Sequence, residues 1–166
     1  MSITAPERQA GFRDAMAHLC APVGVITAMD DDRPHGTTVS ALMSLSVRPP
    51  LVAVSLAQTS DCLALIRRTG IFGVNVLGAG QDALAIRFAA KGPEKFAAVH
   101  WQQRTGVPFI DGSAVWLGCQ VAGTVTGGDH EILLGEVVDL QIDPDASPLT
   151  YHDRRFGTHT AHEGDR

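Results

Sequence analysis

Residues 35–60 constrain the fold most, because they combine two strand-like runs with a fixed bend between them. The first run is rich in small and hydroxyl side chains, the second alternates apolar residues, and Pro49-Pro50 separates the two. Small side chains on a strand let a flat ligand approach the backbone, whose N–H and C=O groups can bond its polar edge. A Ser/Thr-rich strand pair with one solvated face and no ligand has the same composition, so both interpretations stay open at this point.

The N-terminal segment predicts a helix over residues 4–20. Thr4 can cap this helix, and Glu7, three residues later, completes a capping box. Phe12, Met16 and Leu19 recur at helical spacing and form one apolar face. We expect this face to pack on the core.

The rest of the chain alternates strand-like runs with short helical segments. Ser60 begins a short helix that Gly70 ends. The strands and helices do not follow one another in a regular β-α repeat. This predicts a mainly β fold with short helices, arranged as an antiparallel barrel. No G-x-G-x-x-G follows the first strand, which argues against a Rossmann site. Besides the pair in 35–60, the expected strands are 23–29, 71–77, 115–125 and 132–142, and the last two are expected to pair across a turn at 127–129. The other expected helical segments are 81–90 and a helical turn at 94–99. A loop is expected through 106–108.

Composition excludes several classes of protein. A length of 166 residues suggests one domain with a substantial core, and 45 % hydrophobic with 19 % charged residues is typical of a globular chain. The formal charge of -5 argues against a nucleic-acid partner. Three cysteines without a C-x-x-C pair give neither a disulfide framework nor a zinc site, and His159 with His162 supplies too few ligands for any metal. No apolar run of about 18 residues occurs, so we expect no membrane span and a cytoplasmic location.

A motif in the central stretch points to a family. Gly36, Thr38, Ser40, Ser44 and Ser46, followed by Pro49-Pro50-Leu51, form the pattern G-x-T-x-S-x-x-x-S-x-S-x-x-P-P-L. Further matches follow in order: FGVNVL at 72–77, RFA at 87–89, GDH at 128–130 and LGEV at 134–137. Over roughly residues 10–156 the chain resembles the flavin reductase family, which supplies reduced flavin to two-component monooxygenases, and it is most similar to the small reductases of aromatic-polyketide antibiotic pathways.

The resemblance carries expectations for the architecture. It implies a split β-barrel of the FMN-binding, Greek-key type, which forms a homodimer with flavin near the subunit interface. It also implies one flavin reductase-like domain at residues 1–156, which includes the N-terminal helix, and a polar C-terminal tail at residues 157–166.

The resemblance also implies which residues bind the flavin. The isoalloxazine would lie along Thr38, Val39, Ser40 and Ala41 and along Ser55, Leu56 and Ala57. Lys91, just after Phe88-Ala89, would lie near the phosphate, where Ala90 replaces the second basic residue of close relatives. Ser60 is the other phosphate candidate, and Cys62 would line the site as a neutral thiol. Five cations against two anions between Arg67 and Lys95 fit a phosphate site, although a solvated helix face is the preferred explanation for Arg67 and Arg68. The cations are Arg67, Arg68, Arg87, Lys91 and Lys95.

A second group of candidates concerns the nicotinamide. In the resembling family the histidine of the GDH motif faces the flavin, so His130 is the candidate for positioning the nicotinamide. Asp129 is expected to stabilise the turn instead. Tyr151 and Arg155 are further candidates for closing over the dinucleotide.

Together these residues predict an NAD(P)H:flavin oxidoreductase. It would reduce free FMN or FAD with NADH or NADPH, by hydride transfer from nicotinamide C4 to flavin N5, and supply the reduced flavin to a partner monooxygenase. Such an enzyme needs to stack two rings and requires no nucleophile and no obligatory acid–base pair. Two alternatives stay open: a non-catalytic flavin-binding protein on the same barrel, and an oxidase that retains its flavin.

Overall fold

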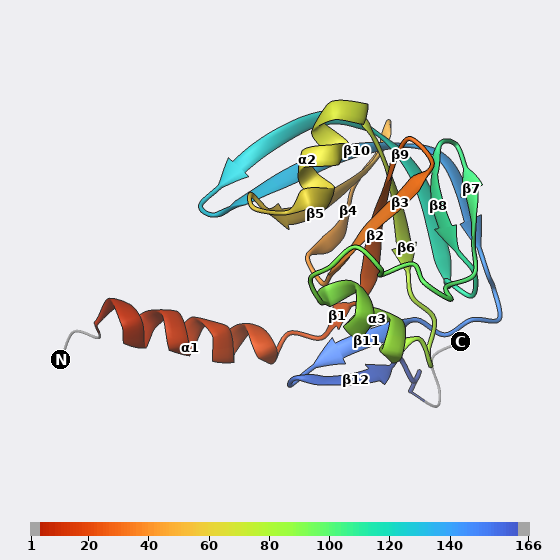
Figure 1. Ribbon diagram of the computed structural model, residues 1–166. Coiled ribbons are helices and arrows are strands. Elements are labelled where there is room, and N and C mark those ends of the chain that lie inside the picture. The colour runs from red at the N-terminus through yellow and green to blue at the C-terminus, as the bar shows by residue number, and fades with distance from the viewer. Residues whose placement is uncertain (1–3, 163–166) are drawn as a thin grey trace.

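The computed structural model describes residues 4–162 and shows a mainly β protein with three helices in that range (Figure 1). The predicted fold class, mainly β with short helices, is therefore confirmed. The helices are α1 (Ala5–Ala17), α2 (Asp61–Thr69) and α3 (Asp82–Ala89). The strands are β1 (Ala21–Pro22), β2 (Gly24–Asp30), β3 (Arg33–Val39), β4 (Leu42–Val47), β5 (Pro50–Ala57), β6 (Ile71–Val76), β7 (Trp101–Arg104), β8 (Val107–Ile110), β9 (Val115–Gly127), β10 (His130–Ile142), β11 (Leu149–His152) and β12 (Arg155–Thr158).

Seven of these strands form one antiparallel sheet in the order β3-β2-β6-β9-β10-β5-β4. The two edge strands, β3 and β4, are consecutive in the chain and only Ser40 and Ala41 join them. Because two residues span so short a distance, the sheet must curl until its edges meet at this end. Among the described residues β3 and β4 are not hydrogen-bonded neighbours, so the sheet is curled but is not the closed barrel that the sequence predicted.

The core lies on the inner face of the curled sheet, under α2. Ser60 caps α2 by accepting a hydrogen bond from the Leu63 N–H, and Gly70 ends the helix at φ 73°, as predicted. The apolar side of α2 is fully buried against the sheet, which places the start of this helix beside β3. The buried side chains of α2 are Cys62, Leu63, Leu65 and Ile66.

A buried polar residue joins the strands beneath this core. Asn75 of β6 is fully buried, and its Nδ2 donates to the Val25 carbonyl (3.2 Å) and to the Pro108 carbonyl (3.4 Å). Its Oδ1 accepts from the Ile110 N–H at 2.7 Å. Since an unpaired buried amide is costly, these bonds fix β8 against β2 and β6.

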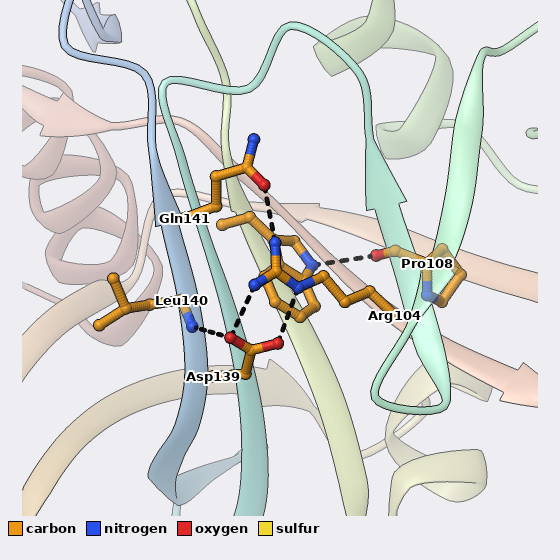
Figure 2. A network of polar contacts seen from close by, with 6 residues as sticks. Arg104, Pro108, Asp139, Leu140 and Gln141 are labelled. Carbon is orange, nitrogen blue, oxygen red and sulfur yellow. Dashed lines mark hydrogen bonds and ion pairs between the residues drawn. The ribbon is translucent and has the colours of Figure 1, made fainter.

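The β7–β8 hairpin occupies the stretch that the sequence predicted as a loop. Figure 2 shows the contact that holds it on the sheet: Arg104 donates from Nε and Nη2 to the two carboxylate oxygens of Asp139, at 2.7 and 2.8 Å, and from Nη1 to Gln141. Its guanidinium also lies 5.0 Å from the centre of the Trp116 ring. These long-range contacts are invisible in the local sequence, which explains why the hairpin was missed.

The two longest strands, β9 and β10, pair across the predicted turn, so that prediction is confirmed. β1, β11 and β12 form a separate three-stranded sheet, and β12 includes Gly157 and Thr158 of the predicted tail. The predicted helix at 81–90 is α3, whereas the predicted helical turn at 94–99 is a run of turns.

The N-terminal helix departs from its prediction. Thr4 and Glu7 form the expected capping box, but no side chain of α1 is buried, and Phe12 and Leu19 are 63 % and 58 % exposed. Figure 1 shows α1 extending away from the body of the molecule. The expected core packing is wrong within one chain, because helical spacing identifies an apolar face but does not say what covers it.

Candidate functional site

A cavity of about 410 Å³ opens between β3, the start of α2 and the segment that follows α3. We call it the lysine cavity. It brings together four of the predicted cofactor-binding residues: Ser60, Cys62, Ala89 and Lys91. Other lining residues that matter below are His35, Gly36, Asp61 and Lys95.

The chemistry of this lining suits an anionic ligand that also carries polar groups. Two lysines, Lys91 and Lys95, outnumber the one carboxylate of Asp61. The Nε2 atom of His35 is buried and has no hydrogen-bond partner among residues 4–162, and such atoms call for an explanation. Burial lowers the pKa of His35 below its ordinary value of 6.5, so its ring is neutral at pH 7. These residues fit the phosphate end of a flavin.

A second hollow, of about 250 Å³, lies on the outer face of the sheet. We use "outer face" for Ala53, Ser55 and Ala57 of β5 together with His130, Ile132 and Leu134 of β10, which the strand register places on one side. The hollow itself contains three of the residues predicted to lie along the isoalloxazine: Ser40, Ala41 and Ser55.

The two hollows are neighbours along the chain. Thr37 lines the lysine cavity and Ser40 lines the outer hollow, three residues apart. At about 3.3 Å per residue, the two positions are separated by roughly 10 Å. The end of β3 and the residues that follow it therefore contribute to both hollows.

His130 lies at the start of β10, opposite Ala57 of β5. Its Nδ1 is 2.8 Å from the carboxylate of Asp129, and the ring is about half exposed. The hydrogen bond with His130 lowers the pKa of Asp129. This contact orients an accessible imidazole on the outer face, next to the residues predicted to lie along the ring.

Several other predicted residues have side chains that are buried in the core or already hydrogen-bonded. Val39 and Leu56 are buried among core residues, and Phe88 is fully buried in a second apolar cluster. Thr38 donates its hydroxyl to the Ala85 carbonyl of α3, at 2.7 Å. In this structure these four residues can offer a ligand little beyond backbone groups and the remaining lone pairs of the Thr38 hydroxyl.

Cys62 lines the lysine cavity with a buried thiol. Its Sγ lies 3.6 Å from the Ile26 carbonyl, and burial raises the pKa of the thiol to about 12. A thiol with such a pKa is protonated and unreactive at pH 7, in keeping with a neutral lining residue.

Tyr151 and Arg155 lie in the small three-stranded sheet and line neither hollow. Tyr151 packs on Phe156 with a ring separation of 5.2 Å, and Arg155 lines a separate hollow of about 510 Å³. Within one chain the structure does not bring them to His130, and their role in closing over the dinucleotide stays a prediction.

Sequence reasoning gave too little weight to two residues of the lysine cavity. In the sequence pattern, Lys95 is one of five cations between residues 67 and 95, and His35 is the first residue of an expected strand. In the structure the Lys95 ammonium is held by two backbone carbonyls, one of them from β3. The excess of positive charge between residues 67 and 95 was the signal that could have found Lys95.

The comparison with known families settles the kinship of the chain. The sequence pattern of the flavin reductase like domain matches residues 16–160. The chain belongs to the flavin reductase family. The resemblance predicted from the sequence motifs is thereby confirmed.

Individual relatives agree over nearly the whole chain. An NADH:riboflavin 5'-phosphate oxidoreductase of Streptomyces pristinaespiralis is 40% identical over 153 residues, which is 90% of this chain and 87% of the relative. The reductase component of a 4-nitrophenol 4-monooxygenase/4-nitrocatechol 2-monooxygenase of Rhodococcus opacus is 37% identical over 156 residues, 94% of this chain and 84% of the relative. The solved structure of the NADH:FAD oxidoreductase SgcE6 of Streptomyces globisporus C-1027, in complex with NAD and FAD fragments, superposes with a TM-score of 0.89 at 28% identity and covers 99% of this chain and 100% of that chain.

Two further observations concern partners. No helix within residues 4–162 combines the length and the apolar character needed to cross a membrane. The described residues also contain no cluster of three or more His, Cys, Asp or Glu side chains that could hold a metal ion.

Arg67 and Glu131 provide the first testable prediction, because their ion pair ties α2 to β10 next to His130. Hydrogen bonds from Arg67 hold the pKa of the nearly buried Glu131 below its ordinary value of 4.5. A depressed pKa in the folded state means that the pair stabilises the fold above about pH 4.5 and that this contribution disappears as the pH falls through the folded-state value. We expect Glu131→Gln to lower the free energy of unfolding at pH 7, with a smaller difference from the wild type in acid, as measured by urea unfolding.

The matched control is Arg68→Gln, which removes the other ion pair of the same helix, with Asp30. Both partners of that pair are more than half exposed, so its loss has little effect at either pH. A Glu131→Gln difference that keeps its full size below pH 4, or that equals the Arg68→Gln difference, would contradict the assignment.

Proposed function

We propose that this chain is an NADH-dependent flavin reductase that reduces free FMN or FAD and supplies the reduced flavin to a separate monooxygenase. The observation that carries the proposal is the similarity over 90% or more of the chain to relatives named as NADH-dependent flavin oxidoreductases and as a monooxygenase reductase component. The two hollows agree with it, since one suits a phosphate and the other is mainly apolar, with the hydroxyl groups of Ser40 and Ser55 in its wall.

The residues of the site would hold a flavin in two parts. Ser40, Ala41 and Ser55 would lie against the ring, where small side chains leave the backbone accessible, and the lysine cavity would receive the phosphate. When bound, the flavin supplies the acceptor for the nicotinamide hydride. The protein's contribution is then to position two rings and exclude wrong orientations, which requires no nucleophile.

His130 is proposed to position the nicotinamide. It is exposed, it is oriented by Asp129, and it lies opposite Ala57 at the edge of the outer face. Because Nδ1 donates its proton to the Asp129 carboxylate, the Nε2 atom of a neutral imidazole can accept a hydrogen bond from the N–H group of a carboxamide, without taking part in proton transfer.

We further propose that the chain forms a homodimer through the outer face of its sheet. Met43, Ile132 and Val125 lie on this side of neighbouring strands, and Met43 and Val125 are more than half exposed. The apolar residues of α1 are also uncovered in one chain. A second copy would cover both surfaces with one symmetric contact. Sedimentation equilibrium that returns only the 17.6 kDa of a single chain would contradict this proposal.

The function is tested by NADH oxidation with and without added flavin, followed by the absorbance of the nicotinamide. We expect consumption that saturates with free FMN or FAD, because flavin acts as a substrate that leaves the site. Flavin binding without any NADH consumption would support the non-catalytic binding protein instead. Flavin that stays with the protein through gel filtration while an organic substrate is oxidised would support the oxidase.

The variant His130→Ala tests the nicotinamide site. We expect the KM for NADH to rise about tenfold while the Kd for flavin changes little, because the lost hydrogen bond concerns only the nicotinamide. His159→Ala, an exposed histidine beyond β12, is the control and leaves both constants unchanged. Equal losses in NADH and flavin binding would show that His130 shapes the whole site rather than the nicotinamide position.

A further inference from the structure

Lys95 is the one lysine of the lysine cavity whose ammonium group is held in place by hydrogen bonds within the described residues. Its Nζ donates to the Gly36 carbonyl of β3 at 3.1 Å and to the Phe88 carbonyl near the end of α3 at 2.9 Å. The side chain therefore bridges two elements of the cavity wall. An ammonium group carries three N–H donors, and these two carbonyls use two of them.

The Lys95 ammonium group is already ordered and only partly solvated, and both properties favour the binding of an anion. Lys95 is partly buried, and burial lowers the pKa of its ammonium, so the charge is incompletely solvated. A long side chain that is already ordered loses little conformational entropy when it binds a ligand. The third N–H donor has no partner among residues 4–162, and the side chain lines the cavity.

Lys91 differs in each of these respects. Its side chain is exposed, and no hydrogen bond or ion pair holds it in the part of the chain that the structure describes. Binding a phosphate would require it to give up the rotamer freedom of a free lysine. The preceding residue, Ala90, offers no second charge.

The rest of the wall agrees with a phosphate ligand. The Asp61 carboxylate balances only one of the two lysine charges, and the neutral ring of His35 brings a buried Nε2 without a partner to the same wall. A cavity of about 410 Å³ falls within the range of roughly 300–1,000 Å³ that is usual for small-molecule sites.

We propose that Lys95, rather than Lys91, is the principal cation that binds the flavin phosphate, and that it makes the site prefer phosphorylated flavins over riboflavin. This inference rests on the proposed function. The competing explanation is structural: a lysine that bonds the last carbonyls of α3 stabilises the end of the helix and need not contact any ligand.

Comparing FMN with riboflavin separates the two explanations, because riboflavin has the same ring and side chain but no phosphate. The experiment measures the Kd of each by quenching of flavin fluorescence in the wild type, Lys95→Gln and Lys91→Gln. We expect Lys95→Gln to weaken FMN binding about 10- to 100-fold and riboflavin binding less than about twofold. Lys91→Gln should weaken FMN binding several-fold less than Lys95→Gln.

Lys95→Arg keeps the experiment informative if Lys95→Gln does not fold, because arginine keeps the charge and the capacity to donate to both carbonyls. It should retain most of the preference for FMN. Three results would each overturn the inference and leave the proposed function intact. The first is that Lys95→Gln weakens FMN binding and riboflavin binding equally, and the second is that it leaves the preference for FMN unchanged. The third is that only Lys91→Gln loses this preference. A wild-type protein that binds neither flavin would overturn both.

Discussion

Only Ser40 and Ala41 join the two edge strands of the main sheet, β3 and β4. This two-residue link forces the sheet to curl until its first and last strands meet. The Ser55 N–H then donates to the Ala41 carbonyl at 3.0 Å, which holds β5 at the seam. Ser40 and Ala41 of this link line the outer hollow together with Leu42 and Met43, which follow them in β4. The outer hollow is therefore a consequence of how the sheet curls.

The lysine cavity depends on the same strand from its other end. β3 continues from the seam toward His35, and two bonds attach α3 to it: the Thr38 hydroxyl donates to the Ala85 carbonyl, and Lys95 joins Gly36 to Phe88. Gly36 is needed for this approach, since a Cβ at that position would lie 2.8 Å from the Phe88 ring. The residues that fix the wall of the cavity thus include Lys95, whose side chain also lines the cavity. Under our proposal for Lys95, one side chain serves both stability and phosphate binding.

Local chemistry made much of this predictable from the sequence. The cap of α2 at Ser60, its end at Gly70 and the pairing of β9 with β10 each follow from residues a few positions apart. The break at Pro49-Pro50 was also predicted correctly, but the stretch 35–60 holds three strands, β3, β4 and β5, and not the two expected, because the first run is interrupted at Ser40 and Ala41. Features that depend on distant partners were not predictable. The β7–β8 hairpin is held on the sheet by the ion pair of Arg104 with Asp139, and the Lys95 ammonium is held by the Gly36 carbonyl, 59 residues away in the chain. The apolar face of α1 is real, but its periodicity says nothing about the surface that covers it.

A reductase that supplies a separate monooxygenase must reduce the flavin and then release it. Both steps can be followed when the protein is mixed with FMN and NADH without oxygen and the absorbance of oxidised flavin is recorded. The mixture is then passed through a membrane that retains the protein. We expect the absorbance of oxidised flavin to fall in proportion to the NADH added and reduced flavin to appear in the filtrate. Unchanged flavin absorbance, or reduced flavin that stays with the protein, would contradict the proposed function.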